Sequence, residues 1–256
     1  IRIEYMQAGA EALLRFDLGV YRHISPEMVV DRVKEADIVI FAGGISPSLE
    51  GEEMYSVNSP GFAGGDRTSI ELPQVQRDIL KALKKAGKKV VFVNCSGSAV
   101  ALVPEMESCD AILQAWYPGQ AGGLAVADVL FGDFNPSGKL PVTFYKNTDQ
   151  LPDFEDYSMK NRTYRYMTEV PLFPFGYGLS YTTFDISKGR LNKKTISAGQ
   201  DLNFKVNVKN TGKYDGAEVI QVYVRKVDDA EGPIKSLRAF RRVPLKAGET
   251  CVVSID

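Results

Sequence analysis

The apolar run at residues 37–44, Asp-Ile-Val-Ile-Phe-Ala-Gly-Gly, constrains the fold of this chain more than any other feature. A short run of apolar and β-branched residues that ends in glycines is typical of a strand buried on both faces, and such strands occur mainly in parallel sheets. The predicted strands are 38–42, 90–94 and 111–115, and the predicted helices are 26–36, 71–86 and 122–131. This alternation predicts an α/β sandwich with a mainly parallel sheet over residues 23–145.

Two of these predicted helices carry recognisable ends. Ser25 precedes Pro26, and this pair favours a helix start because a serine hydroxyl accepts a hydrogen bond from a free backbone N–H. Gly87 follows the second helix at the position where glycine commonly ends helices.

The hydrophobic pattern changes to a period of two after Thr183. Alternation at 201–209, 219–224, 236–243 and 250–255 predicts strands of a small β-sandwich over residues 184–256. A complete sandwich of this kind has about 100 residues, so we expect this one to be incomplete. Residues 146–183, rich in Pro, Gly and aromatic residues, are predicted to be a packed connector, and residues 1–22 a β-hairpin.

Composition excludes several function classes. The formal net charge is -1 without a clustered Lys/Arg stripe, which argues against nucleic acid and anionic membrane surfaces as partners. No apolar run approaches the roughly 18 residues of a membrane span. One histidine, His23, excludes a multi-histidine metal site, and the glycine-rich nucleotide motifs are absent, so we expect no metal or organic cofactor. The three cysteines, at positions 95, 109 and 251, are predicted to be core thiols.

The first candidate site is the glycine-rich loop that follows the 38–42 strand. It carries three carboxylates, Glu50, Glu52 and Glu53. Ligands of open α/β sheets bind beyond the carboxyl ends of the strands, which is where this loop is expected to lie. The alternative is that the three glutamates are ordinary solvated surface residues. Asn94-Cys-Ser-Gly97, at the next strand end, is interpreted as a plain strand-to-loop transition rather than a nucleophile turn, because no histidine follows it.

Seven motifs in the same order resemble the C-terminal half of a glycoside hydrolase family 3 enzyme of the β-xylosidase or β-glucosidase type. The motifs are 44–53 (Gly-Ile-Ser-Pro-Ser-Leu-Glu-Gly-Glu-Glu), 64–73 (Gly-Gly-Asp-Arg-Thr-Ser-Ile-Glu-Leu-Pro), 116–120 (Trp-Tyr-Pro-Gly-Gln), 128–133 (Asp-Val-Leu-Phe-Gly-Asp), 135–144 (Asn-Pro-Ser-Gly-Lys-Leu-Pro-Val-Thr-Phe), 164–166 (Tyr-Arg-Tyr) and 173–184 (Phe-Pro-Phe-Gly-Tyr-Gly-Leu-Ser-Tyr-Thr-Thr-Phe). The resemblance covers most of residues 36–256. Ala121 departs from it, since many members have glutamate there.

The resemblance implies a three-part architecture. An N-terminal TIM barrel, missing from this chain, would carry a nucleophilic aspartate; the α/β sandwich would carry the acid/base glutamate; and a fibronectin-type-III-like sandwich would follow. Residues 1–22 resemble the tail of a carbohydrate-binding β-domain that some members insert. The resemblance further implies a periplasmic or secreted location and a β-linked oligosaccharide substrate, with hydrolysis of terminal β-xylosides or β-glucosides.

The resemblance also assigns roles to particular residues. A retaining glycosidase uses one carboxylate as nucleophile and another as acid/base, and Leu-Glu-Gly at 49–51 best matches the acid/base position, so Glu50 is the expected acid/base residue. Glu52 and Glu53 are reserves. The isolated chain, lacking the nucleophile, is expected to be inactive. The competing hypothesis is a non-catalytic carbohydrate-binding or scaffold module.

Three further residues are weaker candidates for substrate binding. Asp66 and Arg67 are interpreted first as an ion pair that braces the loop, and second as substrate contacts. Trp116, with the adjacent tyrosine, is able to stack on a sugar, but aromatic residues in such turns more often belong to the core.

Overall fold

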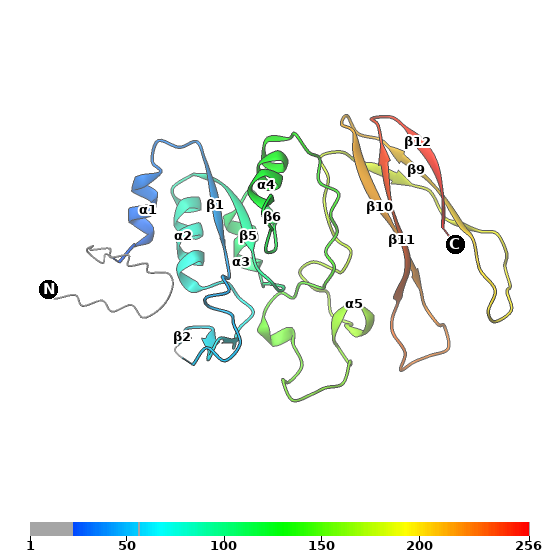
Figure 1. The fold of residues 1–256 in the computed structure, drawn as a ribbon, viewed down its shortest axis with the longest axis horizontal. Coiled ribbons are helices and arrows are strands. Elements are labelled where there is room, and N and C mark those ends of the chain that lie inside the picture. Colours follow the sequence, from blue (N-terminus) through cyan, green and yellow to red (C-terminus); the bar gives the residue numbers. More distant parts are fainter. Residues whose placement is uncertain (1–22, 56, 256) are drawn as a thin grey trace, which may run out of the picture.

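The computed structural model describes residues 23–55 and 57–255, which form an α/β part followed by an antiparallel β part (Figure 1). The predicted hairpin at 1–22 lies outside the described residues. The α/β part contains α1 (Pro26–Arg32), β1 (Ile38–Gly44), β2 (Asn58–Ser59), β3 (Phe62–Ala63), β4 (Asp66–Arg67), α2 (Gln74–Lys85), β5 (Lys89–Cys95), α3 (Val103–Ser108), β6 (Ala111–Gln114) and α4 (Gly122–Phe131). None of the described helices is long and apolar enough to cross a membrane.

The predicted parallel sheet is confirmed. Its strands lie in the order β1-β5-β6, and all pairs are parallel. One face of β1 and β5, carrying Val39, Phe41, Val90 and Phe92, packs against α1 and α2 in the main core. Ile38 and Ile40 of β1 point to the other face and are about half exposed (55% and 50%), so the expectation of burial on both faces is wrong for β1 in the described part of the chain.

The predicted helices form, but α1 ends at Arg32 instead of residue 36, and two further features differ from the prediction. The Ser25 hydroxyl accepts from the backbone N–H of Met28, as predicted. Helix α2 begins at Gln74 instead of residue 71, because Pro73 disfavours helical geometry in the residue before it. Helix α3 was not expected, since six residues are too few to show a helical period.

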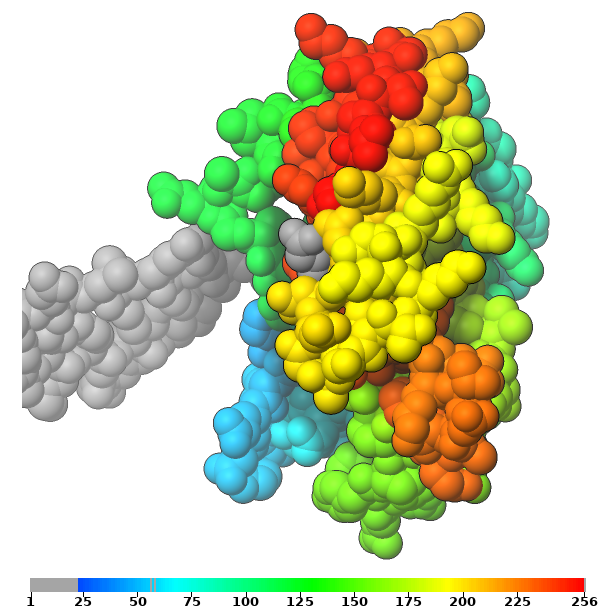
Figure 2. Space-filling model, turned by 90° about the vertical axis from the view of Figure 1, so that its right-hand side faces the viewer, coloured from blue at the N-terminus to red at the C-terminus, as the bar shows by residue number. Residues whose placement is uncertain are grey.

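The β part is a sandwich of two antiparallel sheets, as the period of two predicts. It contains β7 (Phe184–Ile186), β8 (Arg190–Leu191), β9 (Phe204–Asn210), β10 (Gly216–Val224), β11 (Ser236–Leu245) and β12 (Thr250–Ile255). One sheet pairs β10 with β11, and the other has the order β12-β9-β7, with β8 also on β9. Val206 and Val208 of one sheet share a core with Ile220 and Val243 of the other. Figure 2 shows the molecule from this end, with the sandwich coloured yellow to red.

The connector packs tightly onto the sandwich. It includes the short helices η1 (Thr148–Gln150) and α5 (Thr163–Tyr166). Tyr164 of α5 stacks on Phe175 with ring centroids 4.3 Å apart, and its hydroxyl accepts a hydrogen bond from the N–H of Leu237 in β11. Upstream of the connector, Lys139 pairs with Glu218 of β10 at 2.8 Å. These contacts join the two parts through an ordered segment.

Candidate active site

The loop with the three carboxylates starts where β1 ends. Gly44, the last residue of β1, has a φ of 126°, and a Cβ atom there would lie 1.9 Å from the backbone oxygen of Cys95, so only glycine fits. The side-chain amide of Gln76 holds both polar groups of Gly44, at 2.8 Å to its N–H and 2.6 Å to its oxygen. The loop is therefore anchored at the carboxyl edge of the sheet, as expected.

Glu50 lies in the first turn of this loop, where its N–H donates to the backbone oxygen of Ser46. Its side chain is partly buried, with 27% of its surface exposed. The hydroxyl of Ser98 donates to Glu50 Oε1 at 3.4 Å, and Arg67 Nε lies 3.9 Å from the same oxygen. Glu50 is thus a carboxylate that is held from one side and open on the other.

Arg67 is the cation of this site. Its guanidinium donates from Nη1 to Ser98 Oγ at 2.7 Å and to the backbone oxygen of Ala99 at 3.1 Å, and from Nε to that of Ser69 at 3.2 Å. Burial lowers the pKa of Arg67, and the charges of Glu50 and Glu71 act in the opposite direction. Arg67 is thus a largely buried cation held by protein acceptors beside Glu50.

The predicted ion pair between Asp66 and Arg67 does not form; the described acidic partner of Arg67 is Glu50. The two residues make up β4, and consecutive residues of a strand point to opposite faces. Asp66 is exposed, whereas Arg67 turns inward with 10% of its side chain exposed.

Glu52 and Glu53 differ from Glu50 in their surroundings. Both are exposed, and neither side chain has a hydrogen-bond or ion-pair partner among the described residues. Glu53 also has a left-handed φ of 51°. The structure therefore gives Glu50, alone among these three, fixed contacts within the described part of the chain.

Trp116 belongs to the core. Its ring packs edge-on against Phe144 with centroids 6.0 Å apart, and it joins the core cluster that contains Phe92. Tyr117 is nearer to the acidic loop, since its hydroxyl donates to the backbone oxygen of Ile45 at 2.8 Å, while about half of the residue is exposed. The core interpretation of Trp116 is thus supported.

A buried polar cluster behind Glu50 was missed by sequence reasoning. Asn94, inside β5, and Ser96, just after β5, are both completely buried; Ser98 follows in the same loop, and Gln114 ends β6. Asn94 Nδ2 donates to Gln114 Oε1 at 2.6 Å, and Gln114 Nε2 donates to Ser96 Oγ at 3.2 Å. The sequence signal for this cluster is an asparagine, Asn94, within a predicted buried strand, because a buried amide needs hydrogen-bond partners.

Glu71 connects the segment that follows Arg67 to η1. Its carboxylate accepts hydrogen bonds from the N–H and the hydroxyl of Thr148 in η1, at 3.1 and 2.8 Å, and from the hydroxyl of Ser69. Burial by itself raises the pKa of Glu71, but the hydrogen bonds from Ser69 and Thr148 outweigh it and lower the pKa to about 2.

Because the folded pKa of Glu71 lies below its unfolded value of about 4.3, its contribution to stability is present above that pH and is lost as the pH falls towards 2. We expect Glu71→Gln to destabilise the chain at neutral pH and to weaken the acid dependence of its stability. Urea unfolding of both proteins at a series of pH values measures this. Glu107→Gln, an exposed carboxylate on α3, is the control. An unchanged pH dependence in Glu71→Gln would contradict the assignment.

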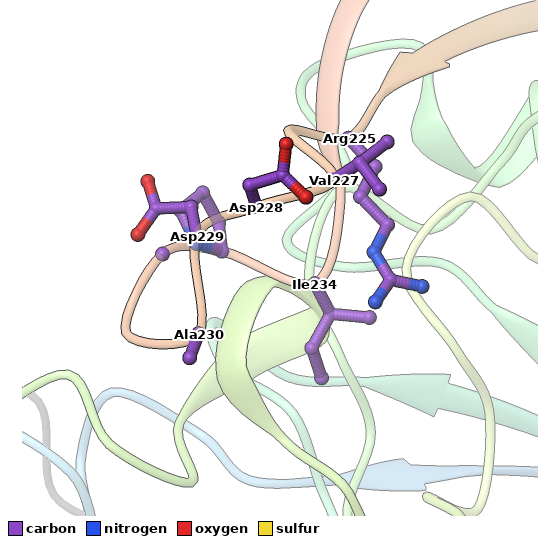
Figure 3. A pocket seen from close by; sticks show the side chains of 8 residues that line it. Arg225, Val227, Asp228, Asp229, Ala230 and Ile234 are labelled. Atoms are coloured by element: carbon purple, nitrogen blue, oxygen red, sulfur yellow. The ribbon is translucent and has the colours of Figure 1, made fainter.

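The hollows described below lack a carboxylate that is held by both a hydroxyl and a guanidinium, as Glu50 is. One of about 410 Å³ lies in the β10–β11 connection, between Arg225 and Ile234 (Figure 3). The side chains of Asp229 and Ile234 point in different directions there, and the Asp229 carboxylate pairs with Lys226 at 3.2 Å. A second, mostly apolar hollow of about 490 Å³ lies beside β6 and Trp116. No metal-binding group of three or more His, Cys, Asp or Glu side chains occurs among the described residues.

Comparison with known proteins relates this geometry to a family. Residues 7–181 match the glycosyl hydrolase family 3 C-terminal domain, and residues 218–256 match the fibronectin type III-like domain. A xylan 1,4-β-xylosidase of Xylanibacter ruminicola is 59% identical over 95% of this chain and 28% of its own length. A periplasmic β-glucosidase of Salmonella typhimurium is 40% identical over 90% of this chain and 31% of its own length.

Solved structures agree with this relationship. A β-glucosidase from Erythrobacter marinus superposes with a TM-score of 0.78 at 36% identity, over 90% of this chain and 30% of that chain. A mutant β-glucosidase from Listeria innocua in complex with laminaribiose has a TM-score of 0.73 at 31% identity, over 92% of this chain and 33% of that chain. The chain thus spans about a third or less of the length of these relatives. Its family match covers well over half of its residues, and the chain belongs to glycoside hydrolase family 3.

Proposed function

We propose that this chain is the C-terminal part of a longer exo-acting glycosidase that hydrolyses terminal β-glycosidic bonds of β-xylosides or β-glucosides. The family relationship supports this reaction class, and the relatives named above are a β-xylosidase and β-glucosidases. The observation that carries the proposal is the setting of Glu50, a carboxylate at the carboxyl edge of a parallel sheet, held by Ser98 and Arg67 and open to solvent on one side.

Glu50 acts as the acid/base residue in this proposal. A nucleophilic carboxylate outside this chain attacks the anomeric carbon, and protonated Glu50 gives its proton to the departing glycosidic oxygen. Ionised Glu50 then takes a proton from a water molecule, whose oxygen displaces the enzyme carboxylate and releases the sugar with retained configuration. The two carboxylates of such an enzyme lie roughly 5 to 5.5 Å apart, so the upstream part must bring its nucleophile close to Glu50.

The neighbouring residues have supporting roles. The Arg67 guanidinium, with Nε 3.9 Å from Glu50 Oε1, supports the position of that carboxylate. Asp66, exposed on β4, is the remaining candidate for a substrate contact, because Arg67 is largely buried and bonds protein acceptors through Nε and Nη1, and Trp116 packs against the core. Glu52 and Glu53 remain reserves for the acid/base role.

The first test uses this chain by itself. It carries one of the two required carboxylates, so we expect no measurable turnover of aryl β-xylosides or β-glucosides. The full-length protein, assayed at the same molar concentration, is the positive control, and circular dichroism establishes that the isolated chain is folded. Substantial activity of the isolated chain would place both catalytic carboxylates within it and would overturn the proposed division of roles.

A further inference from the structure

We propose that Ser98 is a positioning residue for Glu50, and that Arg67 and the side-chain amides of Asn94 and Gln114 hold Ser98 in place for that task. The inference rests on the proposed acid/base role of Glu50. It concerns the strand end at Asn94-Cys-Ser-Gly97, which by sequence is an ordinary transition from strand to loop.

The hydrogen bonds around Ser98 have a defined direction. A guanidinium can only donate, so Ser98 Oγ accepts from Arg67 Nη1 at 2.7 Å, and this leaves the single O–H of Ser98 free for Glu50 Oε1 at 3.4 Å. The Glu50 contact is long for a hydrogen bond, as catalytic contacts often are before substrate binds.

A hydroxyl suits a neighbour that changes its protonation state. Towards ionised Glu50, which can only accept, the Ser98 O–H donates. Towards protonated Glu50, the Ser98 O–H still donates to Oε1, which keeps a lone pair, while a proton on Oε2 stays available for the glycosidic oxygen. Ser98 can therefore hold the carboxyl group in both halves of the reaction without taking up the proton that is transferred.

The support behind Ser98 is a set of hydrogen bonds in which Asn94 and Ser96 are buried and Gln114 is partly buried. The backbone oxygen of Ser98 accepts from Ser96 Oγ at 2.9 Å. Ser96 Oγ in turn lies 3.2 Å from Gln114 Nε2 and 3.3 Å from Asn94 Nδ2. Breaking these bonds would leave further buried polar groups unpaired, which is costly, so they restrict the position of Ser98. They link the carboxyl ends of β5 and β6 to the acid/base residue, and catalytic groups need such fixed support.

The test is Ser98→Ala in the full-length protein, assayed on a glycoside with a poor leaving group and on an activated aryl glycoside. We expect kcat/KM on the poor leaving group to fall by about 10- to 100-fold, since a misplaced proton donor costs rate on that scale. The value of kcat/KM on the activated substrate, which reports the first step only, and the midpoint of thermal unfolding should change little. Ser98→Thr, which keeps the hydroxyl, should restore most of the loss. Ser108→Ala, which removes an exposed hydrogen bond to the backbone oxygen of Pro104, is the matched control and should behave as the unmodified protein.

The outcomes separate this inference from the function on which it rests. If Glu50→Ala shows the leaving-group dependence and Ser98→Ala does not, Ser98 is no positioning residue, although the acid/base assignment survives. Equal losses on both substrates, together with a lower unfolding midpoint, would show a structural role and would also overturn the inference. If Glu50→Ala itself shows no leaving-group dependence, both proposals fail.

Discussion

Glu50→Ala in the full-length protein should lower kcat/KM on glycosides with poor leaving groups by about 10²- to 10⁴-fold, the range that general acid catalysis contributes. The reason is that the variant removes the proposed proton donor to the departing oxygen. Activated aryl glycosides need little protonation, so their first step should remain fast. Initial rates across a series of aryl leaving groups, with a burst measurement for the first step, give this comparison directly.

The same variant loses the general base of the second step. The covalent glycosyl-enzyme intermediate should therefore accumulate, and added azide should restore turnover because it attacks without needing base assistance. The product should be a β-glycosyl azide, which mass spectrometry and NMR identify. Recovery of this product links the lost function to proton transfer rather than to folding.

Glu52→Ala and Glu53→Ala are the matched controls, because they remove carboxylates from the same loop. Neither should show the leaving-group dependence or the azide rescue. If one of them did, and Glu50→Ala remained near normal, the acid/base residue would be misassigned within the correct loop. Absence of rescue at all three positions would exclude the loop as the acid/base site.

Local patterns predicted the fold where the relevant contacts are local. The apolar run before Gly43 and the serine before Pro26 act within a few residues, and the structure shows the strand and the cap that they predict. Helix α2 starts at Gln74 because Pro73 disfavours helical geometry in the residue before it, and Glu71, outside the helix, bonds instead to Thr148, 77 residues away in sequence. The exposed face of β1, with Ile38 and Ile40, also depends on which elements pack on the sheet, and an apolar run does not reveal that.

For the candidate site too, the sequence predicts only what a local pattern or the family resemblance indicates. The loop and Glu50 followed from the strand end and from the family resemblance. Ser98 is 48 residues from Glu50 in sequence, and no spacing rule connects the two. The sequence indicates that Arg67 braces the loop, but its partner is Glu50 and not Asp66, because consecutive side chains along β4 point to opposite faces. Such contacts depend on which loops the sheet brings together at its edge.

The second large effect concerns the buried ion pair between α2 and α3. Arg77 Nε lies 3.1 Å from Glu105 Oε1, and Glu105 is 1% exposed. Arg77→Leu should destabilise this chain by about 3–5 kcal/mol, because it leaves a carboxylate buried without its cation. Urea denaturation followed by circular dichroism measures the change. Lys84→Ala, which removes a half-exposed pair with Asp110 from the same helix, should cost less than about 1 kcal/mol.

The pH dependence and a double variant test the cause of that loss. Burial raises the pKa of Glu105, and Arg77 opposes this rise, so removal of Arg77 makes the ionised form still less favourable in the folded state. The penalty of Arg77→Leu should then grow as the pH rises through the raised folded pKa of Glu105, and should shrink at lower pH, where Glu105 is protonated in both folded proteins. Arg77→Leu combined with Glu105→Leu should recover most of the stability, because no buried charge remains. If the double variant is as unstable as Arg77→Leu alone, lost packing between α2 and α3, and not the unpaired carboxylate, accounts for the effect.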